Sequence, residues 1–292
     1  MKLVLLFNPR SGSGAAQREA ELFAHSLSSA GHGVRLVPIE AWTSDFSGAD
    51  ALVVMGGDGT VHLSLDAAID SGTPVYHVPM GTENLFAREF GMDRRPATLL
   101  SALEGGRIKE VDIARGNGRA FVIMCGVGPD ASIVHRMARR RGRTISHLSY
   151  LGPIFAEFGS PALAPIRVTI DGREAIAEAS GWLVVANSRQ YALRLDPARD
   201  ADMTDGLLDI VFFPGRSIWT ILAWTVLAWT RRQHWLGSFF RARGREVRIE
   251  CLSRPLPLQL DGEAGPHVGR GDEAVRISVD PRRLRVLTPV SR

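Results

Sequence analysis

The sequence is poor in cysteine, the residue that builds disulfide frameworks. Its two cysteines, Cys125 and Cys251, each lie in an apolar, strand-like run, and neither belongs to a C-x-x-C pair. This pattern predicts reduced, buried thiols in a cytoplasmic protein. Internal repeats and low-complexity linkers are also lacking. The 292 residues are therefore expected to form one large or two medium domains around ordinary hydrophobic cores.

A secretory signal is lacking as well. The apolar stretch from Met1 to Phe7 runs directly into Asn8-Pro9, and no small-residue cleavage pattern follows it. We expect a first buried strand here. The formal net charge is +4, the pI is near 9.6, and the cations are mostly arginine. That balance suits phosphate ligands or an anionic membrane surface as well as nucleic acid, so charge alone does not select a partner.

What the sequence does contain is a glycine turn between an apolar run and a helix-like run. Gly56-Gly57-Asp58-Gly59-Thr60 follows residues 51–55 and precedes residues 61–70. Glycines let the backbone approach a ligand closely, and a helix N-terminus favours an anion such as phosphate. In such a loop, Asp58 would hold Mg²⁺ or accept a proton from an attacking hydroxyl. The plainer alternative is a helix cap.

The first half of the chain repeats this arrangement. Apolar strands are predicted at residues 3–7, 34–39, 51–55 and 75–78, and helices at residues 15–30, 61–70, 83–90 and 97–103. The strands 3–7, 51–55 and 75–78 each end in a polar, glycine-bearing loop. Alternating strands and helices are typical of a doubly wound, mostly parallel α/β domain, whose ligands bind at the carboxyl ends of the strands. The three glycine loops should therefore converge.

The second half is predicted to be rich in antiparallel strands. Asn117-Gly118 and Asp171-Gly172 are strong hairpin signals. We predict a C-terminal β-sandwich-like domain with inserted helices at about 130–140, 146–158 and 217–233. The domains would span 1–112 and 113–283, and residues 284–292 could return to the first. The predicted strands are 108–114, 121–125, 166–170, 174–179, 182–187, 207–213, 246–251, 256–260 and 274–279.

Ordered motifs along nearly the whole chain resemble those of the diacylglycerol kinase catalytic family, which includes bacterial soluble lipid kinases and the related sphingosine kinases. Each motif is weak alone, but together they occur in the family's order and at roughly its spacing. The motifs are Asn8-Pro9 with Ser11-Gly12, Gly56 to Thr60, Pro79-Met80-Gly81-Thr82 with Asn84, Gly126-Val127-Gly128 with Asp130-Ala131, Ala186-Asn187, Asp205-Gly206-Leu207-Leu208-Asp209, and Leu260-Asp261-Gly262-Glu263.

The resemblance implies ATP as phosphate donor, Mg²⁺ as metal, and an active site in a cleft between the domains. The residues that it assigns to the nucleotide are Asn8, Ser11, Gly56, Gly57, Asp58, Gly59, Thr60, Val61, His62 and Thr82. It also implies that Asp261 accepts the proton of the lipid hydroxyl, with Asp58 and Glu263 as further catalytic carboxylates. Without the resemblance, Asp261-Gly262 reads as an ordinary hairpin turn.

A second Mg²⁺ site, away from the transferred phosphate, is implied by the block that contains Asp205. The ligands would be the Asp205 side chain with the main-chain carbonyls of Asp202 and Leu207. Oxygen ligands on a tight turn suit a hard cation, but Asp-Gly before an apolar strand is also a common turn.

The sequence departs from the family in three places. His62 stands where the family usually has Asn, and Leu85 stands where diacylglycerol kinases often have Asp. The segment from Val37 to Asp50 is shorter than usual and lacks the family's Thr before a helix. Because Asn84-Leu85 looks more like the sphingosine kinases, the identity of the lipid is left open. His62 could still donate to phosphate but could bring pH dependence or weaker nucleotide affinity. No adenine- or ribose-side contact is assigned in the short segment.

Access to a lipid requires a membrane-facing surface, and two stretches qualify. Residues 135–143 include Arg136, Arg139, Arg140, Arg141 and Arg143, which could attract anionic headgroups or form a solvated helix end.

Residues 218–229 carry Trp219, Trp224 and Trp229 in an apolar helix too short to span a bilayer. Because these tryptophans are spread around the helix, we predict that they are buried in the second domain.

The leading prediction is therefore an ATP-dependent lipid kinase that acts on a diacylglycerol-like or sphingoid lipid. We expect it to be cytoplasmic and peripheral to the inner membrane face, without nucleic acid as partner and with a homodimer as a further expectation. One alternative is a NAD kinase, which shares the G-G-D-G-T loop. The other is a catalytically lapsed lipid- or nucleotide-binding regulator, which the His62 and Leu85 departures would favour.

Overall fold

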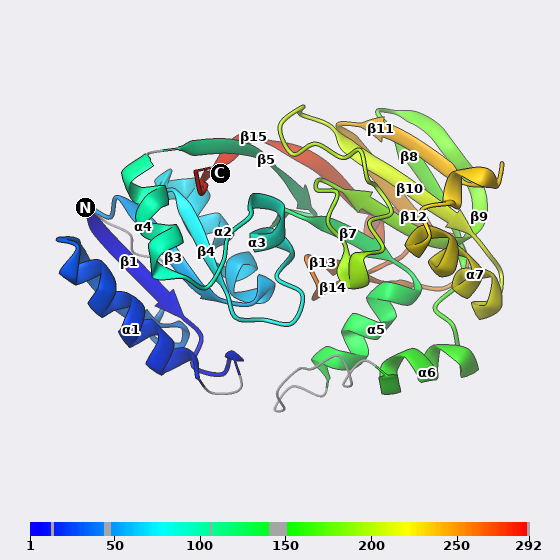
Figure 1. Ribbon diagram of the computed structural model, residues 1–292. Coiled ribbons are helices and arrows are strands. Elements are labelled where there is room, and N and C mark those ends of the chain that lie inside the picture. Colours follow the sequence, from blue (N-terminus) through cyan, green and yellow to red (C-terminus); the bar gives the residue numbers. More distant parts are fainter. Residues whose placement is uncertain (13–14, 44–47, 106, 140–150, 291–292) are drawn as a thin grey trace. The chain divides into compact units, whose positions relative to one another are not determined.

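The computed structural model describes residues 1–12, 15–43, 48–105, 107–139 and 151–290. The chain forms two compact units (Figure 1). Unit 1 comprises Met1–Val111 with Pro281–Arg292, and unit 2 comprises Asp112–Asp280. Two strands, β5 (Ile108–Gly116) and β15 (Val275–Leu287), contain the boundaries between these units. The C-terminal part of β15 therefore belongs to unit 1.

Unit 1 is built on a parallel sheet of β1 (Lys2–Phe7), β2 (Gly33–Pro38), β3 (Ala51–Gly56) and β4 (Val75–Pro79). Their order is β4-β3-β1-β2, and the end of β15 pairs in parallel with β4 through Val286 and Val75. All six residues of β3 are buried. Both faces of this central strand are thus covered, which is why its sequence reads as a continuous apolar run.

The helices of unit 1 are α1 (Ala16–Ser29), α2 (Asp58–Ser71), α3 (Leu85–Phe90) and α4 (Pro96–Gly105). Helix α1 buries Ala16, Ala20, Phe23 and Leu27, a stripe at the spacing of one helix face. The predicted mostly parallel α/β domain is confirmed.

Unit 2 is a β-rich domain whose strands pair antiparallel. One path runs β14-β13-β7-β9-β8-β12-β15, and β10 and β11 extend from β9. The strands not yet defined are β6 (Arg119–Phe121), β7 (Met124–Val127), β8 (Pro165–Ile170), β9 (Arg173–Ala186), β10 (Leu208–Pro214), β11 (Phe240–Gly244), β12 (Glu246–Cys251), β13 (Leu256–Leu260) and β14 (Glu263–Val268).

Strand β9 holds the two layers of unit 2 together. Its first half pairs with β8, and its second half pairs with β7 and β10. Residues from both layers, such as Ile249 and Ile210, share one hydrophobic core. The helices of this unit are α5 (Pro129–Ala138), α6 (Leu151–Gly159) and α7 (Ile218–Trp229). The predicted β-sandwich-like domain with inserted helices is confirmed.

Several predicted boundaries were wrong. Two strands predicted on either side of Gly181 form the single strand β9, because the chain passes so close to β10 that a Cβ at Gly181 would lie 2.3 Å from the Phe213 carbonyl oxygen. Strand β15 likewise joins two predicted segments, and β11 and β14 were missed. Helix α7 ends at Trp229, whereas we predicted a helix to 233. Residues 146–150 of another predicted helix lie outside the described residues.

Both cysteines are buried free thiols, as predicted. Burial raises the pKa of the Cys125 thiol well above its ordinary value and that of Cys251 to about 11, so neither is a reactive thiolate at neutral pH. Within the described part of the chain, every helix falls short of the length and apolar character needed to cross a membrane.

Candidate active site

Three polar loops of unit 1 contact one another at the carboxyl ends of β1, β3 and β4. The Gly12 N–H donates to the Met80 carbonyl oxygen at 3.2 Å, and the Met80 N–H donates to the Gly56 carbonyl oxygen at 2.7 Å. A Cβ on Gly81 would lie only 2.6 Å from the Gly57 Cα. The predicted convergence of the glycine loops is confirmed, and Gly81 is required here because any side chain would push the loops apart.

Helix α2 begins inside the glycine motif. Gly57 is its N-cap residue and provides no side-chain cap, while Asp58 opens the first turn. The Asp58 carboxylate accepts a hydrogen bond from the Phe86 N–H at 3.1 Å, so it links α2 to the start of α3. The N-terminal end of α2 carries the positive end of the helix dipole and favours an anion. Asp58 thus has a structural role, because it links two helices, and it is also a candidate catalytic group.

His77 is a residue of this site that the sequence analysis missed. Its side chain is fully buried, and Nε2 lies 2.9 Å from the Gly56 carbonyl oxygen. Because that oxygen can only accept, Nε2 carries the hydrogen and donates it. Burial lowers the pKa of His77, and the negative charge of Asp58 opposes this effect. His77 is therefore a neutral imidazole, and its hydrogen bond to Gly56 holds the glycine loop in place.

The loop after β4 is held by Asn84. Its Oδ1 accepts from the Gly81 N–H at 2.7 Å, and its Nδ2 donates to the Gly81 carbonyl oxygen at 2.8 Å. Asn84 has φ +51°, a left-handed conformation that Asn tolerates. Thr82 is half-buried within this clamped loop, and Leu85 is 5% exposed. Leu85, where diacylglycerol kinases often have Asp, is therefore a packing residue in this chain.

The remaining predicted nucleotide residues lie on the same loops. Asn8 follows β1 directly and its Oδ1 accepts from the Arg10 N–H at 3.0 Å. The Ser11 N–H donates to the Asn8 carbonyl oxygen at 3.0 Å. Thr60 and Val61 are buried within α2, whereas Gly59 and His62 are half-buried in its first turns. Thr60 packs back on Gly56, where an added Cβ would lie 2.3 Å from its hydroxyl oxygen.

In unit 2, Asp261 and Gly262 form the two-residue turn that joins β13 to β14. Their φ values of +51° and +81° are the left-handed pair that a tight hairpin turn requires. Asp261 is 5% exposed. One oxygen, Oδ1, accepts from the Ile123 N–H at 2.8 Å and the Met124 N–H at 3.0 Å. The other, Oδ2, accepts from the Val122 N–H at 2.8 Å.

Asp261 therefore anchors the segment before β7 as well as being the predicted proton acceptor. Three backbone donors orient its carboxylate, and Oδ1 accepts two of these bonds while Oδ2 accepts one. Glu263 begins β14 opposite Leu260 and is half-buried. This anchoring could not be predicted from the sequence, because the donors lie about 138 residues earlier in the chain.

Asp130, from another family motif, is half-buried beside β7. Tyr191 donates its hydroxyl to Asp130 Oδ2 at 2.9 Å, and a Cβ at Gly126 would lie 2.0 Å from the same oxygen. Burial raises the pKa of Asp130, and the Tyr191 hydrogen bond opposes this effect. Asn187, from the neighbouring motif, donates to the carbonyl oxygens of Asp112 and Val122. Asn187 therefore helps to hold the segment around Val122 in place.

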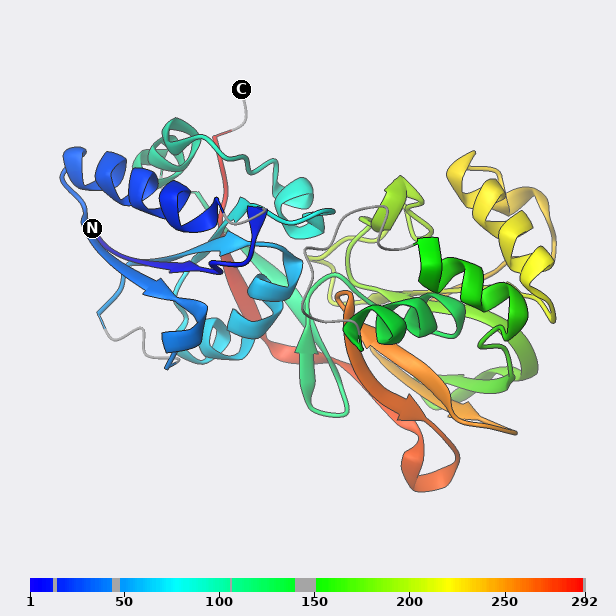
Figure 2. The ribbon, with the colours of Figure 1, turned by 90° about the horizontal axis from the view of Figure 1, so that it is seen from below.

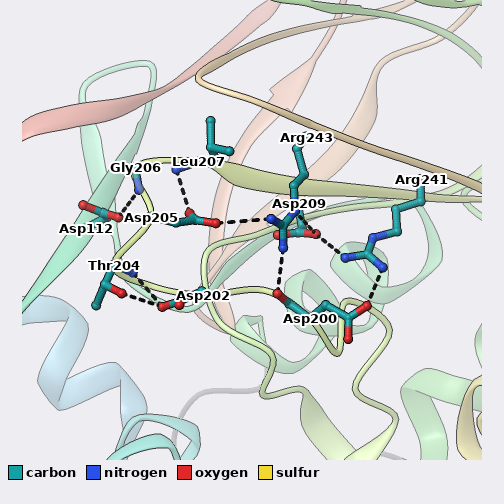
Figure 3. Close-up of polar contacts among 10 residues, drawn as sticks. All are labelled: Asp112, Asp200, Asp202, Thr204, Asp205, Gly206, Leu207, Asp209, Arg241 and Arg243. Carbon is teal, nitrogen blue, oxygen red and sulfur yellow. Dashed lines mark hydrogen bonds and ion pairs between the residues drawn. The ribbon is translucent and has the colours of Figure 1, made fainter.

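The Asp205 turn forms an acidic cluster with two arginines (Figure 3). Asp205 Oδ1 accepts from the Leu207 N–H at 3.0 Å, and Oδ2 pairs with Arg243 at 3.3 Å. The Asp202 side chain accepts from the N–H and hydroxyl of Thr204. Arg243 and Arg241 also bind the buried Asp209, as Figure 3 shows.

The predicted Mg²⁺ site of the Asp205 side chain with the main-chain carbonyls of Asp202 and Leu207 stays a prediction. Arg243 pairs with one oxygen of the Asp205 carboxylate. In the described ranges, no group of three or more His, Cys, Asp or Glu side chains is placed to hold a metal, and this finding does not cover main-chain carbonyls. Arg241 and Arg243 were missed by the sequence analysis. Arg241 and Arg243 are alternate residues of β11, which pairs with β10. This strand pairing brings them to Asp209, and it could not be read from the sequence.

The arginine-rich stretch is only partly described. Arg136 pairs with the buried Glu157 of α6 at 3.2 Å, and Ser132 and the Ala162 N–H also donate to this carboxylate. Arg140, Arg141 and Arg143 lie outside the described residues. Arg136 is therefore an internal ion-pair partner.

Comparisons with known protein families find a matching family model for each half of the chain. A diacylglycerol kinase catalytic domain model matches residues 2–115, and a YegS C-terminal NAD kinase beta sandwich-like domain model matches residues 123–288. The chain belongs to the diacylglycerol kinase catalytic family. The resemblance suggested by its motifs is thereby confirmed.

Individual members of the family cover nearly all of the chain. A diacylglycerol kinase of Mycobacterium tuberculosis is 28% identical over 304 residues, covering 99% of this chain and 95% of that protein. A probable YegS-like lipid kinase of Pseudomonas aeruginosa is 30% identical over 284 residues, covering 94% and 88%. The crystal structure of a putative diacylglycerol kinase from Bacillus anthracis has a TM-score of 0.75 at 19% identity, covering 98% and 95%. This last likeness bears on the fold.

Proposed function

We propose that this protein is an ATP-dependent lipid kinase, which transfers the γ-phosphate of ATP to a hydroxyl of a diacylglycerol-like or sphingoid lipid. The observation that carries the proposal is the contact of the glycine loops at Gly57 and Gly81, within a chain that the family models cover in both units. The relatives named as diacylglycerol or lipid kinases support the choice of a lipid acceptor.

The nucleotide phosphates would bind at the N-terminal end of α2. Gly57 and Gly59 leave room for close approach, and the helix dipole favours negative charge. Asn8, Ser11, His62 and Thr82 would contribute polar contacts from the same loops. Asp58 would hold the Mg²⁺ that accompanies ATP, and this ion would neutralise charge on the transferred phosphate.

Proton transfer from the lipid hydroxyl would go to Asp261, with Glu263 as a neighbouring carboxylate. The N–H groups of Val122, Ile123 and Met124 donate to its two carboxylate oxygens. These backbone donors would hold the carboxylate in a fixed direction, which a general base requires.

The proposal is tested by incubating the protein with [γ-³²P]ATP and a total lipid extract, and identifying the labelled lipid. We expect one lipid class to be labelled by wild type. Asp58→Asn should weaken Mg-ATP binding as well as turnover, because Asn keeps an oxygen for the Phe86 N–H but loses the charge. The affinity is measured by calorimetry. Lipids that stay unlabelled under all conditions would contradict the proposal.

A NAD kinase is the second candidate, because the family model for unit 2 describes a NAD kinase beta sandwich-like domain. Incubation of the protein with ATP and NAD decides between the two. We expect no NADP to form. Formation of NADP, without labelled lipid in the extract experiment, would replace the lipid-kinase proposal with this one.

A further inference from the structure

Helices α6 and α7 and the turn after them expose a group of large apolar side chains, here called the aromatic face. Among the exposed large hydrophobic side chains of the described residues, all five aromatic ones lie here. Trp219, Trp229, Trp235 and Phe155 are each between 65% and 70% exposed. The face consists of Phe155, Phe158, Trp219, Val226, Trp229, Trp235 and Leu236.

Helix α7 has two distinct sides. Ile221, Trp224 and Ala228 form the buried stripe, at the spacing of one helix face. Trp219 and Val226 are seven residues apart and therefore lie on the same side, opposite that stripe. The prediction that the tryptophans of this helix are buried was wrong for Trp219 and Trp229. Of the three tryptophans only Trp224 is buried, and it attaches the helix together with Ile221 and Ala228.

The buried side holds α7 firmly in place. Trp224 Nε1 donates to the Pro214 carbonyl oxygen at 2.8 Å, and its ring packs against Phe213 with centroids 5.5 Å apart. Ser217 caps the helix by accepting from the Thr220 N–H at 3.3 Å. The exposed tryptophan side chains of α7 are therefore carried by a helix that is fixed in place, and their exposure is a property of the folded unit.

Helix α6 extends the same face. Phe158 contacts Trp219 edge-on, with centroids 5.6 Å apart, and Figure 2 shows α6 in green beside α7 in yellow. Phe155 is 6.1 Å from Phe158 and is 67% exposed. Side chains from two segments about 60 residues apart in sequence therefore form one patch, the kind of contiguous exposed surface that marks an interaction site.

In the two segments that form the aromatic face, residues 151–159 and 210–245, the exposed charged side chains are all positive. Residues 210–245 contain no Asp or Glu, and Arg216, Arg231 and Arg232 are exposed beside α7. Arg232 stacks over the Trp235 ring, with its guanidinium carbon 4.6 Å from the centroid. The one acid of α6, Glu157, is 1% exposed and paired with Arg136. These two segments thus combine tryptophan and arginine without an exposed carboxylate of their own.

We propose that the aromatic face docks the protein onto an anionic lipid bilayer. Tryptophan is favoured at the headgroup level of membranes, and arginine is attracted to anionic headgroups. The twelve residues of α7 span about 18 Å, so the helix lies on the bilayer and does not cross a core of roughly 30 Å. A second copy of the chain is disfavoured as the occupant, because it would bring like charges together. The inference rests on the proposed function, since a kinase for a membrane lipid must reach the bilayer.

Binding to vesicles tests the docking without requiring catalysis. Large unilamellar vesicles of phosphatidylglycerol and phosphatidylcholine are titrated into the protein, without ATP, and bound protein is measured by sedimentation. Trp219→Ser with Trp229→Ser should weaken binding by about tenfold or more. Arg231→Gln with Arg232→Gln should weaken binding by about fivefold per arginine and flatten its dependence on salt. Vesicles with brominated chains should quench the wild-type tryptophan fluorescence.

The matched control is Leu22→Ser with Leu63→Ser, two leucines that are 55% and 63% exposed on α1 and α2. This variant should bind vesicles like wild type. If the tryptophan variant also binds like wild type, the proposal is wrong. Loss of a wild-type dimer in sedimentation velocity, with vesicle binding unchanged, would instead assign the face to a second copy. Vesicle binding without phosphorylation of any lipid would contradict the proposed function alone.

Discussion

At the scale of single residues, Asp261 combines a proposed chemical role with a structural one. Both carboxylate oxygens accept backbone hydrogen bonds. In Asp261→Asn, an NH₂ group must replace one of these acceptors and face a backbone N–H. We expect the variant to lose about 1–3 kcal/mol of unfolding free energy, the cost of an unsatisfied buried donor. Urea denaturation measures this loss.

Asp272→Asn is the matched control, because Asp272 is exposed on the same unit. Its free energy of unfolding should change by less than about 0.5 kcal/mol. If Asp261→Asn is as stable as this control, the three hydrogen bonds do not anchor the segment. If the stability is unchanged, a loss of turnover in Asp261→Asn can be attributed to the loss of proton transfer alone.

At the scale of elements, the turn before β10 decides whether a second Mg²⁺ can bind. We propose that Mg²⁺ replaces Arg243 on Asp205 Oδ2, because a divalent ion attracts a carboxylate more strongly than a guanidinium. Millimolar Mg²⁺ should then raise the thermal unfolding midpoint of wild type but not of Asp205→Asn. Asp200→Asn is the control, since Asp200 is exposed and pairs with Arg241. Equal stabilisation of all three proteins would remove the metal site from this turn.

The exposed side of helix α7 could not be predicted from the sequence. Its residues are apolar almost all round, so hydrophobic periodicity identifies no exposed side. Only the packing of Trp224 against Phe213 and Pro214 defines which side is buried. An apolar sequence was therefore compatible with both a core helix and a surface helix.

At the scale of the whole molecule, the buried His77 should make stability depend on pH. Burial lowers the pKa of its imidazole below the ordinary 6.5, so the unfolded chain binds a proton that the folded chain excludes. The free energy of unfolding should therefore have its full value above pH 6.5 and should fall as the pH drops below 6.5. The loss is at most about 1.4 kcal/mol per pH unit for one proton. His135, whose pKa is also lowered by burial, adds a slope of the same sign.

His77→Gln isolates the contribution of His77. Gln can donate to the Gly56 carbonyl oxygen but does not titrate. We expect the variant to have a smaller loss of unfolding free energy than wild type between pH 7 and pH 5, measured by urea denaturation at each pH. Identical pH profiles for the two proteins would show that His77 does not carry this dependence.

The fold class, the family and the glycine loops could be predicted from the amino-acid sequence. Strands such as β3 are apolar throughout, and Gly and Asn tolerate turn conformations that other residues disfavour, so local chemistry was decisive there. The anchoring of Asp261, the groups that contact Asp205 and the exposed side of α7 could be seen only in the folded chain. These depend on partners far along the chain, such as Ile123 for Asp261 and Arg243 for Asp205. A hydrogen-bond partner across a sheet leaves no periodic signal in the sequence, because it is set by strand pairing and register.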